Sequence, residues 1–213
     1  MVQPPRDIEA KTGPDFLARD FSESFAQMRH YDSLELSLVK FACAGYVALI
    51  GGAYTIYQSL VHKDADVTRF MGLFLTASLL AGLLLLGYIV RNRVYFVLVA
   101  RYVNEHRELF LRGSPLGFAN RTGMYTDWTK PAFFNPVSTH SFLMYFLAAL
   151  NAGLLAAAVF FWTGGTLPLW GCVIVWVLGT VLQAAAGAVY LRRKEVKSGA
   201  DEVAFGDSPG KEE

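Results

Sequence analysis

Four long apolar segments, nearly free of charged residues, constrain the fold of this chain more than any other feature of its sequence. They cover residues 36–57, 70–90, 141–162 and 167–191. A helix needs about 20 such residues to cross the hydrocarbon core of a bilayer. The composition agrees, because 54% of the residues are apolar and 17% are charged, a more apolar profile than that of a typical soluble domain. We therefore predict an all-α, polytopic membrane protein with four transmembrane helices.

The connections between these segments predict how the helices pair. Only residues 163–166 separate the third and fourth segments, which leaves room for a tight turn, so we expect an antiparallel hairpin. We expect the first two segments to form a second antiparallel hairpin through residues 58–69. The predicted fold is thus two hairpins with helical cytoplasmic extensions.

The basic residues predict the orientation. Of 19 Lys and Arg residues, four precede the first segment, seven lie between the second and third, and five follow the fourth. Basic residues are retained on the cytoplasmic side, so we expect both termini to be cytoplasmic. Residues 1–35 lack the pattern of a cleaved signal peptide, and we expect the first span to be an uncleaved anchor in a bacterial inner (plasma) membrane.

Outside the spans, the pattern predicts two amphipathic helices and an aromatic loop. Apolar residues at helical spacing predict a cytoplasmic helix over 15–35 and a helical extension of the second span over 91–112. Residues 113–140 combine turn formers with five aromatic residues, and we expect them to pack on these helices or lie among the lipid headgroups. We expect disorder in the N-terminal tail, 1–14, and beyond the basic start of the C-terminal tail, 192–213.

The extension carries the apolar stripe that we predict to be a contact surface. The stripe of this extension also includes Val99. The polar residues of the extension are expected on its other faces: Arg101, Asn104, Glu105, Glu108 and Arg112. Because such a stripe would otherwise face water, we expect it to bind a second copy of the chain or a protein partner on the cytoplasmic side. The predicted contact residues are Tyr95, Leu98, Tyr102, Leu109 and Phe110.

Two amides in apolar spans predict a helix–helix contact. Asn151 lies about 10 residues, and Gln183 about 8, from the expected cytoplasmic ends of their spans, so their depths agree within about 3 Å. We predict a hydrogen bond between them, with Gly153, Gly179 and Gly187 allowing close approach. A contact between subunits and a substrate-binding role are the alternatives.

The sequence carries no motif for a catalytic, cofactor or metal site. Cys43 and Cys172 are expected at different depths, too far apart for a disulfide, and the histidines lack the spacing of a metal-binding pair. Basic residues fall in short clusters beside the spans, so no nucleic-acid partner is expected. An acid–base group is conceivable only if side chains from separate segments meet at the inner surface: Glu105, His106, Glu108, Asp127 and His140.

These observations favour a non-enzymatic membrane subunit that oligomerises or binds a partner through its cytoplasmic helices, with the lipid bilayer as its other partner. One alternative is an oligomeric pore or membrane-perturbing effector, although the spans hold no Asp, Glu, Arg or His of the kind that marks ion pathways. A small membrane enzyme with a cytoplasmic-face site is the second alternative.

Overall fold

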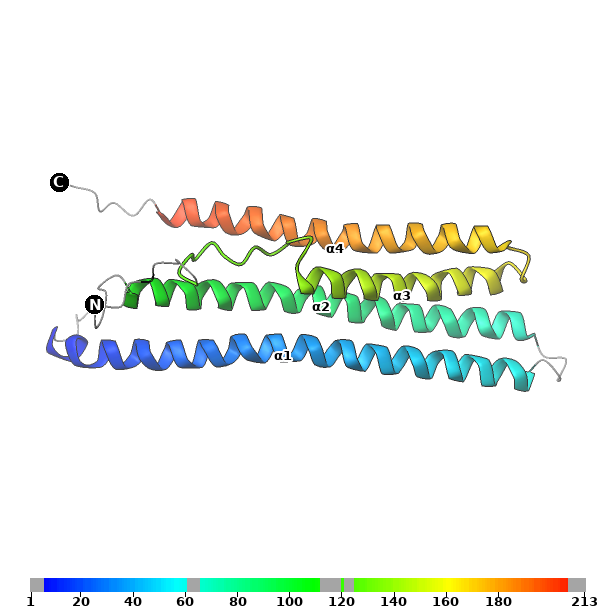
Figure 1. The fold of residues 1–213 in the computed structure, drawn as a ribbon, viewed down its shortest axis with the longest axis horizontal. Coiled ribbons are helices and arrows are strands. Elements are labelled where there is room, and N and C mark those ends of the chain that lie inside the picture. The colour runs from blue at the N-terminus through cyan, green and yellow to red at the C-terminus, as the bar shows by residue number, and fades with distance from the viewer. Residues whose placement is uncertain (1–5, 61–65, 112–119, 121–124, 207–213) are drawn as a thin grey trace. The chain divides into compact units, whose positions relative to one another are not determined.

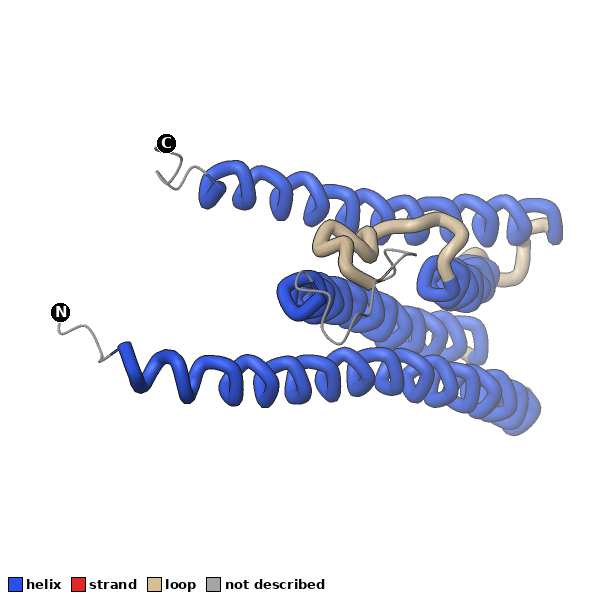
Figure 2. The backbone as a smooth tube through the Cα atoms, turned by 60° about the vertical axis from the view of Figure 1, so that its left-hand side comes forward, coloured by secondary structure: helices blue, strands red, loops and turns tan. Residues whose placement is uncertain are grey.

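The computed structural model describes residues 6–60, 66–111, 120 and 125–206, and within them the side chains of 15–59, 66–111, 120 and 125–197. Its helices are α1 (Arg6–Leu60), α2 (Val67–Leu111), α3 (Thr139–Trp162) and α4 (Leu169–Gly206) (Figure 1). Figure 2 shows helices and loops, and the described residues contain no strand. All four helices are long and apolar enough to cross a membrane, which confirms an all-α fold with four candidate spans.

Side-chain caps explain where α2 and α3 begin. The carboxylate of Asp66 accepts a hydrogen bond of 3.1 Å from the backbone N–H of Arg69. The hydroxyl of Ser138 accepts one of 3.3 Å from the backbone N–H of Ser141. Both bonds satisfy N–H groups that have no partner within the helix.

Two glycines close the turn between α3 and α4. Gly164 and Gly165 have φ angles of 65° and 76°, a region that favours glycine because it has no Cβ. The N–H of Gly165 donates to the carbonyl of Phe160 at 2.9 Å. Pro168 directly precedes the first residue of α4, where its fixed φ suits a helix start. Helix α4 therefore begins at Leu169 rather than at the expected residue 167.

The helices extend into both terminal segments for which we predict disorder. Helix α1 begins at Arg6, within the expected tail 1–14, and α4 continues to Gly206, within the expected tail 192–213. Polar composition limits burial, but it does not stop a helix that is already nucleated, because each added residue gains a hydrogen bond without a new nucleation cost. Residues 1–5 and 207–213 of these tails lie outside the described part, as do 112–119 and 121–124 of the aromatic loop.

The chain divides into two compact units. Unit 1 comprises Met1–Leu34 and Asn92–Ala132, and unit 2 comprises Glu35–Arg91 and Phe133–Glu213. Each unit has its own buried side chains: Val97 and Val103 are fully buried in unit 1, and Ile89 and Met144 in unit 2.

Within unit 2, α3 and α4 lie side by side in both views (Figures 1 and 2), and their backbones approach each other closely. Small residues allow this approach, which lipid-exposed helices need for close packing. Buried alanines at 148, 152 and 156 on α3 supply part of this small surface.

The outer helices leave large apolar surfaces uncovered. In the most apolar window of α4 only 6% of the residues are buried, and in that of α1 only 11%. Leu169 and Leu182 of α4 are 82% and 68% exposed. Contiguous apolar surface of this extent is rare on a soluble monomer, whereas lipid tails contact it without penalty.

Within unit 1, aromatic side chains join the two helical segments. The rings of Tyr31 and Tyr95 stack with centroids 6.0 Å apart, and Phe21 meets Phe110 edge to face at 6.4 Å. The amide of Asn92 also donates to the carbonyl of Tyr31 at 3.0 Å. These contacts hold the N-terminal part of α1 against the C-terminal part of α2.

Candidate functional site

A buried polar contact joins three helices of unit 2. The hydroxyl of Tyr46 on α1 donates a hydrogen bond to the side-chain carbonyl of Asn151 on α3. Gly82 on α2 lies against both groups, and a Cβ built there would be 2.6 Å from the Tyr46 oxygen and closer still to Asn151. Gly82 therefore provides the space in which Tyr46 and Asn151 meet.

The predicted hydrogen bond between Asn151 and Gln183 is absent. Asn151 is fully buried and its amide nitrogen has no partner, and the side-chain oxygen of Gln183 is likewise buried and unpartnered. Gln183 instead lines a separate groove with Val90 and Gly187. Comparable depth along two helices does not fix their rotation about their own axes, and the rotation of α3 turns Asn151 to Tyr46.

Two of the three predicted contact glycines lie at close contacts. A Cβ at Gly179 would be 3.2 Å from the Cβ of Ala152, and one at Gly187 would be 2.6 Å from the sulfur of Met144. At Gly153, by contrast, a Cβ would meet nothing within 4 Å. Gly153 instead lines an open groove.

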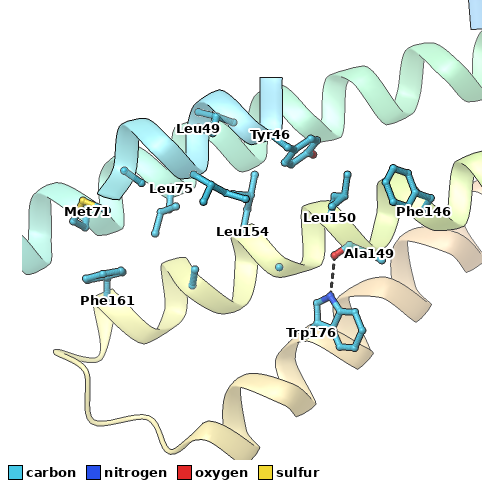
Figure 3. Close-up of a pocket in the computed structure, with 14 residues that line it drawn as sticks. Tyr46, Leu49, Met71, Leu75, Phe146, Ala149, Leu150, Leu154, Phe161 and Trp176 are labelled. Carbon is cyan, nitrogen blue, oxygen red and sulfur yellow. Dashed lines mark hydrogen bonds between the residues drawn. The ribbon is translucent and has the colours of Figure 1, made fainter. Parts of the chain in front are cut away.

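That groove is the cavity shown in Figure 3, about 600 Å³ in volume. Its lining comes from all four helices and carries no charged side chain. Tyr46 is at one side, and Trp176 of α4 donates its indole N–H to the carbonyl of Ala149 at 2.9 Å (Figure 3). Such a lining suits apolar chains.

A buried carboxylate–imidazole pair links α1 to the start of α3. The Nδ1 of His140 lies 2.9 Å from a carboxylate oxygen of Glu35, and their side chains are only 4% and 12% exposed. The Nε2 of His140 is buried without a hydrogen-bond partner. A carboxylate fixes the orientation of an imidazole in this way in catalytic and metal sites, but no cavity described here reaches this Nε2.

A second carboxylate–imidazole contact lies in unit 1. The carboxylate of Asp20 accepts a hydrogen bond of 2.7 Å from the Tyr102 hydroxyl and lies 3.5 Å from Nε2 of His106. The His106 ring is 4.4 Å from the Tyr102 ring, and its Nδ1 is buried without a partner. These contacts fasten α1 to α2 within unit 1.

The candidate acid–base residues have separate partners. His140 belongs to unit 2 and pairs with Glu35, whereas His106 belongs to unit 1 and faces Asp20. Asp127 is exposed, and hydrogen bonds from the side chain and backbone of Thr129 hold the pKa of its carboxyl below the usual value. The hydrogen bonds to this carboxyl thus come from its own turn. Among the described residues, no group of three or more His, Cys, Asp or Glu is arranged to hold a metal ion.

The predicted contact surface is exposed along α2. Its five side chains are 40–50% exposed: Tyr95, Leu98, Tyr102, Leu109 and Phe110. Glu105, which we expected on another face, is also exposed and follows Leu98 by two turns at the edge of this surface. Helix α1 contacts part of three of these side chains: Tyr31 stacks on Tyr95, Asp20 accepts a hydrogen bond from Tyr102, and Phe21 meets Phe110.

Sequence reasoning missed the partners of the buried polar groups. Tyr46 lies about ten residues into its span, as Asn151 does, and a phenol that deep needs a hydrogen-bond partner. This was a usable signal. The sequence around Glu35 and Asp20 gave no such signal, because an acidic residue beside an amphipathic helix is more often solvated. Comparison of the chain with protein-family models, curated proteins and solved structures found no match.

Proposed function

We propose that this protein is a non-enzymatic subunit of a bacterial inner membrane that self-associates through the helices of unit 1. The proposed topology has two antiparallel hairpins, α1 with α2 and α3 with α4, and both termini in the cytoplasm. The four apolar helices and the placement of Lys and Arg beside them support this arrangement. Unit 1 then lies on the cytoplasmic side.

The exposure of the predicted contact surface carries the proposal. Leu98 and Leu109, two large aliphatic side chains three turns apart on α2, are 46% and 50% exposed. Outside the bilayer such side chains contact water unless another surface covers them, and burial contributes about 25 cal/mol per Å² of apolar area. A second copy can present the same stripe, so one apolar surface suffices for a symmetric, self-complementary interface.

The variant Leu98→Glu tests this proposal. It places a charge in the centre of the surface, where assembly would bury it without a partner. In a mild detergent, we expect the unaltered protein to sediment as an oligomer and Leu98→Glu to sediment as a monomer.

Phe16→Glu is the matched control. Phe16 is also an exposed apolar residue of unit 1, at 67%, but it lies on α1 outside the contact surface, so this variant should remain oligomeric. Circular dichroism checks that both variants keep their helices. An unaltered protein that is monomeric at every concentration tested, or a Leu98→Glu variant that assembles normally, would contradict the proposal.

A further inference from the structure

Unit 1 contains a groove of its own, about 780 Å³ in volume, which is separate from the contact surface. It lies where α1, α2 and residues 125–131 meet. Its floor is apolar and includes Phe25, Met28 and Phe96. This volume is within the range of sites that bind small molecules or anchor residues of a peptide, about 300–1,000 Å³.

Hydrogen bonds hold the loop that forms one wall of the groove. The buried amide of Asn104 on α2 donates to the carbonyls of Asp127 and Lys130, at 3.1 and 2.8 Å. The guanidinium of Arg101 donates to the carbonyl of Pro131 at 3.2 Å. These bonds run from a helix to a loop backbone, so the groove is formed before any ligand arrives, which lowers the ordering cost of binding.

The rim of the groove is positively charged. The Arg107 guanidinium lies 5.4 Å from the Phe25 ring and 5.2 Å from the Tyr125 ring, and Arg29 lies 5.0 Å from the Phe25 ring on α1. Lys130 adds a third cation to this part of unit 1. In the described part of the chain none of these three cations forms an ion pair.

Among the described residues that line the groove, one carries a carboxylate. Asp127 lines the groove, but its Oδ1 already accepts hydrogen bonds from the backbone and hydroxyl of Thr129. The groove lining holds two cations, Arg107 and Lys130, against the one carboxylate of Asp127, and Arg29 lies beside it over the Phe25 ring, so the lining keeps an excess of positive charge above an apolar floor. Its complement is a ligand that joins negative charge to apolar groups.

An acidic protein segment meets this description better than a lipid. Under the proposed topology Arg107 lies about 17 residues beyond the expected end of the second span, or about 25 Å at helical rise. The headgroup layer adds only about 5–8 Å on each side of the hydrocarbon. Aromatic rings and a flexible Met28 are also the side chains that accept apolar anchors of amphipathic helices.

We propose that the groove between Phe25, Phe96 and Lys130 binds an acidic amphipathic segment of a partner protein, with Arg107 contacting its carboxylates and the apolar floor its anchor residues. This inference rests on the cytoplasmic placement of unit 1 in the proposed function. It uses a different face of α2 from the self-association surface.

The test uses the full-length protein in nanodiscs of zwitterionic lipid, which expose both faces of the membrane. The probe is a fluorescein-labelled helical peptide of about 15 residues with Glu on one face and Leu and Phe on the other. Fluorescence anisotropy should show saturable binding that weakens with added salt. A matched peptide with Gln in place of Glu should bind about tenfold more weakly or worse.

Two variants and one control locate the binding. Arg107→Glu should weaken binding of the acidic peptide about tenfold or more. The same variant should bind a peptide with Lys in place of Glu more tightly than it binds the acidic peptide. Phe96→Ala should weaken the acidic and Gln peptides alike, because it removes apolar floor without changing charge. Arg193→Glu, which reverses an exposed cation of unit 2, should leave binding unchanged, and circular dichroism checks the fold of each variant.

Three outcomes would overturn the inference. Equal binding of the acidic and Gln peptides would remove the role of charge, and unchanged binding by Arg107→Glu would place the site elsewhere. If the acidic peptide does not bind, but a soluble short-chain phosphatidylglycerol binds saturably, the groove would be a lipid site. Because Leu98→Glu leaves the groove intact, failure of self-association can be distinguished from failure of peptide binding.

Discussion

Among the described glycines, Gly82 has the least room for a side chain, because it lies where the side chains of Tyr46 and Asn151 meet. The variant Gly82→Ala places a methyl group in space that these groups occupy. Overpacking of this kind lowers the free energy of unfolding by about 1–3 kcal/mol. Reversible unfolding in mixed micelles of increasing SDS content measures this loss.

Gly87→Ala is the matched control for this substitution. Gly87 lies on the same helix, but a Cβ there would meet nothing within 4 Å. Because alanine favours helix more than glycine does, this variant should be as stable as the unaltered protein or slightly more stable. Equal stability of the two variants would show that the three-helix contact does not form as described.

The buried pair of Glu35 and His140 predicts a second loss of stability. The variant Glu35→Ala leaves the His140 ring, 4% exposed, without its only described hydrogen-bond partner. Leaving a buried polar group without its hydrogen-bond partner costs about 1–3 kcal/mol, so the midpoint of thermal unfolding in detergent should fall. Glu23→Ala, which breaks the exposed pair with Arg19 on the same helix, should change that midpoint little. A fall of equal size in both variants would argue against a structural role for the buried pair.

These residues also show what a sequence reveals about polar groups in spans. The apolar surroundings of Asn151 indicate that its amide needs a hydrogen-bond partner. Gln183 was predicted as that partner only because the two residues lie at a similar depth in the membrane. The partner Tyr46 comes from a helix more than a hundred residues away in sequence, and only the rotation of three helices brings the two groups together. Periodicity gives no information on that rotation where a span is apolar on every side.

Between helices, the contact of α3 with α4 depends on small residues at particular positions. Gly179→Val places branched carbons against Ala152 and Leu155, whose atoms lie 3.2 and 3.1 Å from a Cβ at this position. Gly153→Val adds the same atoms where nothing lies within 4 Å. We expect Gly179→Val, and not Gly153→Val, to lower the unfolding midpoint in SDS. The reverse order would mean that the two helices pack through other faces.

The extent of each helix followed from the sequence only in part. The apolar cores of the four spans were correctly predicted, because about 20 apolar residues without charge leave few alternatives. The ends at Arg6 and Gly206 were not, because the polar residues there were interpreted as disorder. Caps such as Ser138 define helix ends well, but the outer ends of α1 and α4 lack so clear a signal.

For the molecule as a whole, the topology is the prediction that most needs a direct test. In a background where Cys43 and Cys172 are replaced by Ala, single cysteines are introduced as Thr166→Cys, in the turn before α4, and Val137→Cys, before α3. Both positions are exposed. In intact cells a membrane-impermeant maleimide should label Thr166→Cys and not Val137→Cys, and permeabilisation should allow labelling of both. The opposite pattern would place the termini outside.

The candidate site is less predictable from sequence than the fold. The exposed stripe on α2 was visible as a periodic pattern, and all five of its predicted residues are exposed. The groove of unit 1 was not visible, because it requires Phe25, Phe96 and Lys130 from three separate segments. Asn104, which anchors its loop wall, is one polar residue among several on an amphipathic helix, and nothing in its local sequence distinguishes it.

The turn between α3 and α4 bears on how the chain enters the membrane. Under the proposed topology, the polar segment that must be carried across the bilayer with these helices is Thr163–Gly164–Gly165–Thr166, which has no charge. The segment between the first two spans, residues 58–69, includes Lys63, Asp64, Asp66 and Arg69, and each charge is costly to move through hydrocarbon. Translocation of the second pair therefore requires far less work, and α3 and α4 are expected to leave the insertion machinery together as one unit.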